Sequence, residues 1–306
     1  MSTHSVPAYR VLVRMRSGRT LMVEGDSDKV VMSRLMHEFA SIPKKVKGRP
    51  IIDTPALVAD DSLAGLGNKE KVLAVAQECA GDVGFSALVD REWDGFDELT
   101  LTLGSVSTAL PASVSTTAGH SIENYFMEAD NFRSLIIRNH AEDISAQSLQ
   151  AMFEAYDHVT HFALAYSLAV KDHALLNRLS GYLRRSHLDY GANGFHLNHD
   201  FEQGLSTRGI SAPDSAQLRA EVDRRLINSN AALNHVRKWA SHGHIGYGAA
   251  WVCLSRIADS EGVDRLICEQ LERGNNVDKL RGAADRLATG NFDRQPLDAL
   301  VQWLAA

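Results

Sequence analysis

Carboxylates cluster at two places in this sequence, and each cluster directly follows a short apolar run. Glu24 follows the first run, and Asp90, Glu92 and Asp94 follow the second. Anionic groups that lie close together repel one another unless a cation sits between them. Oxygen ligands that leave room for water suit Mg²⁺ or Mn²⁺, and they suit neither structural Zn²⁺ nor copper. The four residues therefore predict one Mg²⁺ or Mn²⁺ site.

Two β-strands must position these carboxylates. The apolar runs Thr20–Val23 and Phe85–Val89 have the length and composition of buried strands. In an open α/β sheet, functional groups gather beyond the carboxyl ends of the strands. Neighbouring parallel strands lie about 4.8 Å apart, so we expect Glu24 and Asp90 to project into one crevice.

A third motif lies in residues 117–126 and contains His120 and Glu123. Spacing alone makes these two residues an i, i+3 pair at the start of a helix. In order along the chain, the first two motifs resemble those of the Toprim fold, the catalytic domain shared by topoisomerases, primases and OLD-type nucleases. The Toprim signature is a Glu after the first strand and an Asp-x-Asp after a later one, here Glu24 and Asp90-x-Glu92.

The third motif, which reads His-Ser-Ile-Glu-Asn-Tyr from His120, narrows the similarity to the AriB-type effectors of the PARIS phage-defence system. By motif, the similarity covers residues 9–127. It implies an α/β domain with a Toprim-like, mostly parallel sheet flanked by helices. It also implies a metal-dependent nuclease, a toxic effector that cleaves RNA, tRNA in particular, and that an ABC-type ATPase partner holds in check.

The resemblance further implies a role for each candidate residue. Asp90 and Glu92 would hold Mg²⁺ (or Mn²⁺), and Glu24 would act as general acid or base, or as a ligand through water. His120 and Glu123 would orient the site from a second layer of contacts, or contact the substrate.

One departure from the family pattern leaves two questions open. Glu92 stands where the family has Asp, so the second direct ligand is either Glu92 or Asp94. The same departure keeps a rival function open, in which the chain is a catalytically inactive regulatory or binding subunit that docks on an ATPase.

Each carboxylate cluster also has a purely structural interpretation. Residues 24–28 fit a helix start, with Asp26 or Ser27 as N-cap and Asp28 favourable to the helix dipole. Residues 90–95 fit a solvated turn, because Asp and Gly dominate turns. The apolar run directly before Asp90 favours a functional site over a plain turn.

Histidines supply two weaker alternatives. His158 and His161 lie i, i+3, but no carboxylate or cysteine stands beside them at a recognisable Zn²⁺-ligand spacing. Arg133 and His140 loosely fit the Arg-then-His spacing of HEPN-type ribonucleases, a pattern that arises easily by chance.

Composition describes an ordinary globular protein. The 306 residues are 44% hydrophobic and 23% charged, and no apolar run approaches the roughly 20 residues of a membrane span. The first seven residues lack the features of a signal peptide, so a cytoplasmic location is expected. The net charge of −6 argues against a broadly basic surface that binds nucleic acid, so any basic rim around a catalytic cleft is local. The candidates for such a rim are residues 43–50 and Arg178 with Arg184 and Arg185.

The three cysteines are expected in the core.

Hydrophobic periodicity divides the chain into a catalytic α/β part, residues 1–127, and a helical part for regulation, partner binding or substrate binding, residues 128–306. Alternation in residues 9–15 and 20–23 predicts a β-hairpin, followed by a helix over 28–39, a strand at Ile51–Asp53 and a helix over 68–80. Trp239, Trp251 and Trp303 are candidates to anchor contacts with the ATPase or a second copy of the chain. Helices are expected over 149–170, 172–185, 215–239, 246–257, 263–272, 277–288 and 296–304.

Overall fold

The computed structural model describes residues 3–41, 48–273 and 277–306. The chain forms two compact units, each described separately below. The first comprises Met1–Asp94, Ser105–Ile122 and Leu280–Ala306, and the second comprises Gly95–Gly104 and Glu123–Lys279. This division differs from the expected one at residue 127, because the last 27 residues join the α/β unit and a short insertion, Gly95–Gly104, joins the helical one.

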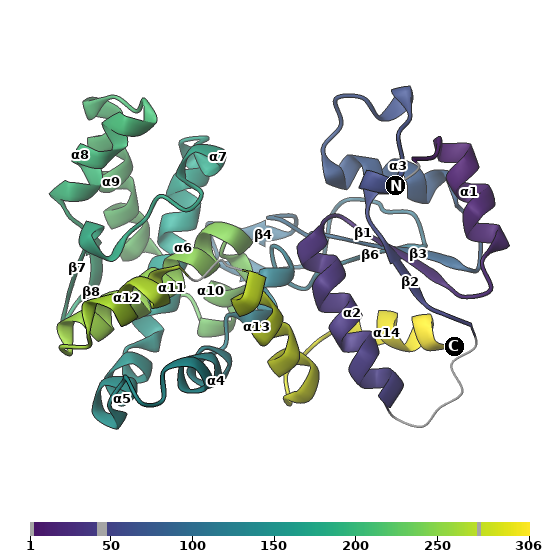
Figure 1. The fold of residues 1–306 in the computed structure, drawn as a ribbon. Coiled ribbons are helices and arrows are strands. Elements are labelled where there is room, and N and C mark those ends of the chain that lie inside the picture. Colours follow the sequence, from purple (N-terminus) through teal and green to yellow (C-terminus); the bar gives the residue numbers. More distant parts are fainter. Residues whose placement is uncertain (1–2, 42–47, 274–276) are drawn as a thin grey trace. The chain divides into compact units, whose positions relative to one another are not determined.

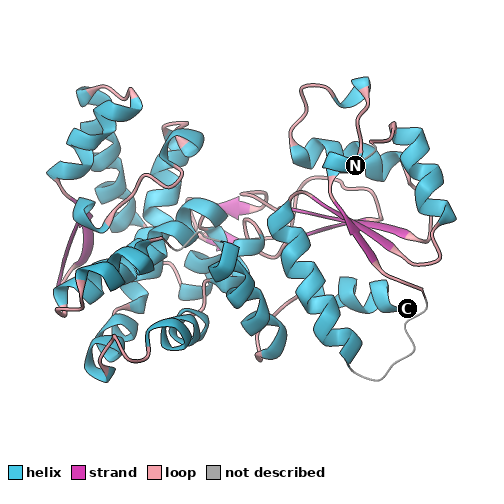
Figure 2. Ribbon diagram, in the orientation of Figure 1, coloured by secondary structure: helices cyan, strands magenta, loops and turns pink. Residues whose placement is uncertain are grey.

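A four-stranded parallel sheet forms the centre of the first unit (Figure 2). Its strands are β1 (Thr20–Val23), β2 (Ile51–Asp53), β3 (Phe85–Val89) and β6 (Val114–Thr116), in the order β2-β1-β3-β6. The central strands β1 and β3 pair in register, with Val23 opposite Leu88. The expected α/β class with a parallel sheet is therefore confirmed.

Helices cover the sheet on both faces within this unit (Figure 1). On one face, α1 (Val6–Met15) and α3 (Asn68–Glu78) contribute to an apolar core. On the other lie α2 (Asp26–Ser41) and α14 (Leu297–Ala305), which contact each other. The core between the sheet and the first pair of helices includes Val6, Tyr9, Val13, Met22, Val72, Val75, Ala76, Phe85, Ala87 and Val89.

The hairpin predicted before β1 is wrong, because residues 6–15 form the helix α1. Ser5 accepts a hydrogen bond from the Ala8 N–H as its N-cap, and a proline stands in the first turn. Val6, Tyr9 and Val13 are buried on one side. Their spacing of three and four residues is helical, and it outweighs the alternation of polar and apolar residues.

The second unit is mainly helical (Figure 1). Two short hairpins interrupt the helices: β4 (Phe96–Asp97) with β5 (Thr102–Leu103), and β7 (Leu188–Gly191) with β8 (Gly194–Leu197). Its helices are α4 (Ala129–His140), α5 (Ala146–Glu154), α6 (Tyr156–Asp172), α7 (Leu176–Leu179), α8 (His199–Leu205), α9 (Ala212–Asn228), α10 (Asn234–Ala240), α11 (Gly243–Ser260) and α12 (Arg265–Glu272), and α13 (Val277–Thr289) crosses the unit boundary.

Three of the expected helices are shorter than predicted or divided. The helix expected over 149–170 breaks at Ala155, and the one over 215–239 ends at Asn228 and restarts at Asn234. Only the four residues of α7 are α-helical between 173 and 184. Ala174 and Gly181 have positive φ there, a conformation that an α-helix cannot contain.

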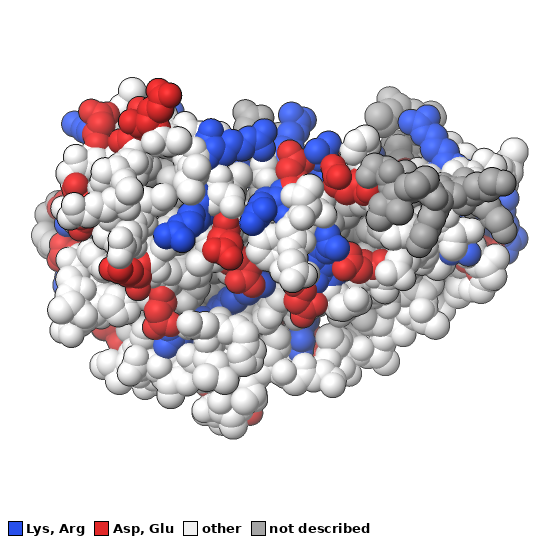
Figure 3. Space-filling view, turned by 90° about the horizontal axis from the view of Figure 1, so that it is seen from below, with Lys and Arg blue, Asp and Glu red and all other residues white. Residues whose placement is uncertain are grey.

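Several other expectations concern the surface and the core. Cys79, Cys253 and Cys268 are all buried, as predicted. Trp251 is 1% exposed and belongs to the core, so it is not available to anchor a partner. Side chains of both charge signs are interspersed over the face in Figure 3. Most of the basic stretch 43–50 and the expected breaker at 274–276 lie outside the described residues. None of the described helices has the length and apolar character that a membrane span requires.

Candidate metal centre

Two of the predicted ligands directly follow the two central strands of the sheet. Glu24 directly follows β1, and Asp90 directly follows β3. The Asp90 backbone N–H donates a hydrogen bond to Glu24 Oε1 across 2.7 Å. The first two motifs therefore follow neighbouring strands within one unit of the chain.

Glu24 lies in an environment that disfavours its charged form. Burial raises the pKa of its carboxyl to about 7, and the carboxylates of Glu92 and Glu70 push it in the same direction. The Asp90 N–H and the Lys69 ammonium oppose this rise without cancelling it. A partly buried carboxylate with such a pKa is a candidate for binding a cation or exchanging a proton near neutral pH.

Glu92 occupies a strained backbone position, and its carboxylate is paired with a lysine. Its φ of 60° lies in the left-handed region, which is uncommon for a residue with a long side chain. Its carboxylate is 3.0 Å from Lys69 Nζ, and the side chain is 56% exposed. The ion pair gives Glu92 a partner other than a metal ion.

Asp94 holds a loop. Its Oδ1 accepts hydrogen bonds from the Ser107 N–H at 2.8 Å and the Ser107 hydroxyl at 2.5 Å, and Oδ2 accepts from the Thr108 N–H at 3.1 Å. These hydrogen bonds hold the pKa of Asp94 well below its usual range. The residue thus fixes the loop at 107–108, which is a structural role.

The third motif braces the turn after β3. The Glu92 N–H donates to the His120 carbonyl at 2.7 Å, and the rings of His120 and Trp93 pack edge to face at 4.4 Å. Arg91, which is 7% exposed, sends its side chain to the carbonyls of Asp94 and Ala118. His120 therefore positions the acidic turn.

Arg91 was not among the predicted site residues, because only the acidic residues of the cluster were candidate ligands. The signal was an arginine directly beside a predicted strand end, flanked by Asp and Glu. The structure also joins its backbone N–H to Thr117 Oγ1 at 2.9 Å, so Arg91 and Thr117 both connect the second motif to the third.

Glu123 belongs to the second unit, and its partners there are different. It is 3% exposed, and its Oε1 lies 3.1 Å from His244 Nδ1. The adjacent Asn124 donates from its amide to the carbonyls of Lys238 and Ser241 at 2.7 and 2.9 Å. Within its own unit, this half of the motif fixes the segment that leads into α11.

The first motif contains the candidate ligand Glu24 and also the start of the helix α2. Asp28 Oδ2 accepts a hydrogen bond from the Gly25 N–H at 2.9 Å, and α2 begins at Asp26. The structural interpretation is therefore correct for Asp28, which stabilises the turn between β1 and α2.

The two strand-end carboxylates can serve as ligands of Mg²⁺ only if water and substrate supply the other ligands. Within residues 3–41, 48–273 and 277–306, no group of three or more His, Cys, Asp or Glu side chains is placed to hold a metal ion. Mg²⁺ in nucleotide and nucleic-acid enzymes commonly binds through one or two carboxylates, with water and substrate phosphate completing its shell. Glu24 and Asp90 supply two carboxylates at adjacent strand ends for such a site, whereas the described residues form no site closed by protein ligands alone.

The histidine alternatives gain no support from their surroundings. His161 Nε2 lies 3.1 Å from the Ser229 hydroxyl, and His140 Nδ1 lies 3.6 Å from Asp143. Burial lowers the pKa of both His140 and His161. These contacts are those of ordinary helix packing.

No protein-family model matches the chain, and no curated protein is significantly similar to it in sequence.

Proposed function

We propose that this chain is a metal-dependent nuclease of the Toprim-like class whose active centre is built on Glu24 and Asp90. The observation that carries the proposal is the position of Glu24 and Asp90 directly after the two central, neighbouring strands of a parallel sheet, where the Asp90 backbone N–H donates to the Glu24 carboxylate. That edge is where α/β sheets place their ligands. The resemblance of the three motifs to AriB-type effectors adds the class of reaction.

Each protein group has a defined part in the proposed reaction. A divalent cation, when bound, neutralises phosphate charge and polarises the phosphoryl oxygen. Asp90 is the direct ligand, and its backbone N–H holds the Glu24 carboxylate at 2.7 Å. Because the pKa of Glu24 is raised to about 7, this carboxyl can take a proton from water or give one to the leaving oxygen at neutral pH.

A hollow in the same unit carries more basic than acidic residues and supports a phosphate-bearing substrate. It has a volume of about 540 Å³, and its charged lining is Lys29, Arg34 and Arg281 with Asp26 and Asp285. Arg34 is paired with Asp285. Cationic side chains of this kind can contact the phosphates of a nucleic acid. The resemblance to AriB-type effectors makes RNA, and tRNA in particular, the proposed substrate. The same resemblance makes an ABC-type ATPase the proposed partner.

One rival function has a specific observation in its favour. Glu92 is paired with Lys69, and Asp94 is bound to Ser107 and Thr108, so both carboxylates already have partners within the protein. A catalytically inactive subunit that docks on an ATPase would tolerate that arrangement.

Cleavage assays separate the two functions. Purified chain is incubated with total RNA and with plasmid DNA in Mg²⁺, with EDTA as the metal-free control. The nuclease proposal expects cleavage in Mg²⁺ that Asp90→Asn abolishes and that Asp61→Asn, a change to an exposed carboxylate in the same unit, leaves intact. Absence of cleavage of either substrate, in the presence and absence of the proposed ATPase, would favour the binding subunit.

A further inference from the structure

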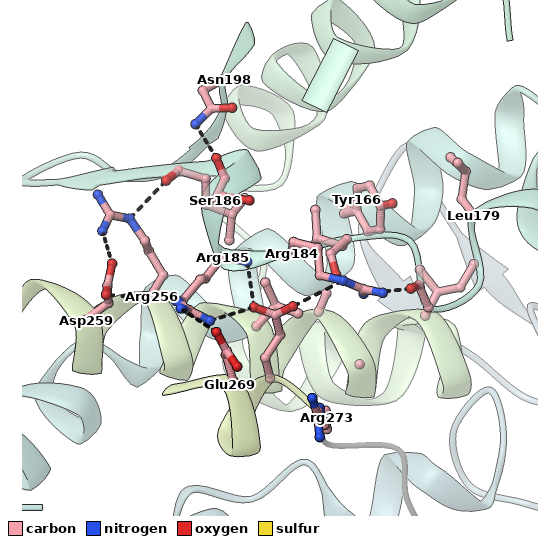
Figure 4. Close-up of a pocket in the computed structure, with 18 of the residues that line it drawn as sticks. Tyr166, Leu179, Arg184, Arg185, Ser186, Asn198, Arg256, Asp259, Glu269 and Arg273 are labelled. Carbon is pink, nitrogen blue, oxygen red and sulfur yellow. Dashed lines mark hydrogen bonds and ion pairs between the residues drawn. The ribbon is translucent and has the colours of Figure 1, made fainter. Parts of the chain in front are cut away.

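The second unit contains a large cavity that the proposed nuclease centre does not use. Its volume is about 1040 Å³, and its lining comes from the segments around η4 (Arg185–His187) and β7, and from α11 and α12 (Figure 4). All of these segments belong to the second unit. Small-molecule sites commonly enclose about 300–1,000 Å³, so the cavity has the size of a nucleotide site.

Arginine dominates the polar part of the cavity. Five arginines and four acidic residues line it. The acids hold the arginines in place: Glu272 contacts Arg184 Nε at 3.2 Å and Arg185 Nη1 at 3.3 Å, and Asp259 contacts Arg256 Nη1 at 3.0 Å. An arginine whose fork is fixed by a carboxylate loses little freedom when it binds a further anion.

Two of these arginines, Arg184 and Arg256, retain N–H donors for such an anion. Arg184 directs Nε to Glu272 and Nη1 to the carbonyls of Gly181 and Leu183 at 2.7 and 2.8 Å. Arg256 directs Nε to the Leu188 carbonyl at 2.9 Å and Nη1 to Asp259. Neither Nη2 group has a partner within the described part of the chain.

Arg273 has no side-chain hydrogen bond or ion pair with any described residue, and Figure 4 draws it without a dashed line. A guanidinium carries five N–H donors, so three arginines at one cavity offer far more donors than their protein partners use.

The remaining lining is apolar and contains one unsatisfied hydroxyl. Leu183, Ile245 and Val252 line the cavity together with Tyr166. Tyr166 is 1% exposed, and its hydroxyl has no hydrogen-bond partner among the described residues. A buried hydroxyl without a partner costs free energy, which a ligand that supplies one would recover. Apolar surface beside arginine donors suits a ligand with a flat base and a phosphate group.

We propose that this cavity is a binding site for a nucleoside phosphate, with the phosphate held by Arg184, Arg256 and Arg273 and the nucleoside against the apolar lining around Tyr166. An anion is favoured over a cation because the arginines outnumber the acids, and because the acids that hold Arg184 and Arg256 are already paired. The ligand is either a free nucleotide or the phosphorylated end of an RNA.

Calorimetric titration of the full chain with ATP and with GTP in EDTA tests the site apart from any metal at Glu24. A parallel titration with a short 5′-phosphorylated RNA and its unphosphorylated counterpart distinguishes the two sources of the phosphate. Arg273→Ala is the cleanest variant, because this side chain has no partner in the described chain to leave unpaired. Tyr166→Phe removes only the hydroxyl, and Arg219→Ala, which breaks an ion pair with Glu202 outside the cavity, is the matched control.

We expect Arg273→Ala to weaken binding at least about tenfold, as the loss of charge-assisted hydrogen bonds does, and Arg219→Ala to leave it unchanged. Tyr166→Phe should weaken binding less, without loss of fold. Preference for the phosphorylated RNA over both free nucleotides, with the same dependence on Arg273, would assign the site to an RNA end. Failure of all four ligands to bind at millimolar concentration, or equal affinity in Arg273→Ala and Arg219→Ala, would overturn the proposal.

Discussion

Glu24→Gln should stabilise the fold at alkaline pH while removing function. The folded protein raises the pKa of Glu24 from 4.5 to about 7. Between these two values the folded state holds a proton that the unfolded state releases, so stability falls as the pH rises through this window. The shift is 7 − 4.5, roughly 2.5 units, and at about 1.36 kcal/mol per unit it corresponds to roughly 3 kcal/mol. Glutamine stays neutral and escapes this cost, and its carbonyl can still accept the Asp90 N–H.

Urea unfolding of both proteins in EDTA, at pH values from about 4.5 to about 8.5, measures the effect. The free energy of unfolding of Glu24→Gln relative to wild type should grow by about 3 kcal/mol across this range. Asp61→Asn, at an exposed carboxylate of the same unit, should change this slope much less. Added Mg²⁺ should stabilise wild type at pH 8.5 and leave Glu24→Gln unaffected. A difference between Glu24→Gln and wild type that does not vary with pH, or a variant that is less stable at pH 8.5, would refute the burial argument.

Three further perturbations probe the site and the second unit. Asp90→Ala should abolish Mg²⁺-dependent cleavage, whereas Glu92→Asp should retain most of it, because Glu92 is bound to Lys69; equal losses in cleavage rate would show that Glu92 is a direct ligand. Arg225→Met, which removes three ion-pair contacts of a side chain only 13% exposed, should destabilise the second unit by about 3 kcal/mol in thermal unfolding, and an unchanged melting temperature would contradict this. Gly246→Ala places a methyl 2.7 Å from Ser241 Cβ and should cost about 1–3 kcal/mol, unlike Gly248→Ala on the same helix, where the methyl meets nothing within 4 Å.

The sequence was sufficient for the two central strands of the sheet because each is a short apolar run directly followed by a carboxylate. Thr20–Val23 and Phe85–Val89 are strands with those bounds, and their neighbouring positions follow from the α/β pattern. The first helix was mistaken for a strand although Ser5 and Pro7 supply an N-cap and first-turn proline. The alternation of polar and apolar residues in this segment predicted a strand, and the helix-start signals were given less weight.

The details of the candidate site depend on contacts that sequence patterns do not record. Lys69 reaches Glu92 from α3, 23 positions earlier in the chain, so the ion pair that engages Glu92 exists only in the folded unit. The positive φ of Glu92 is likewise a consequence of the turn and is not signalled by its residue type. Arg184 and Arg273 line one cavity from distant segments, and no local motif connects them.

Binding of Mn²⁺, followed by electron paramagnetic resonance at pH 8, tests the central claim most directly, because it asks whether the strand-end carboxylates hold a divalent cation. We predict one saturable Mn²⁺ site in the wild-type chain whose affinity falls at least about tenfold in Glu24→Gln and in Asp90→Ala. Asp61→Asn should bind as wild type does. No saturable binding by the wild-type chain, with or without RNA present, or binding that survives both substitutions, would contradict a metal centre at Glu24 and Asp90.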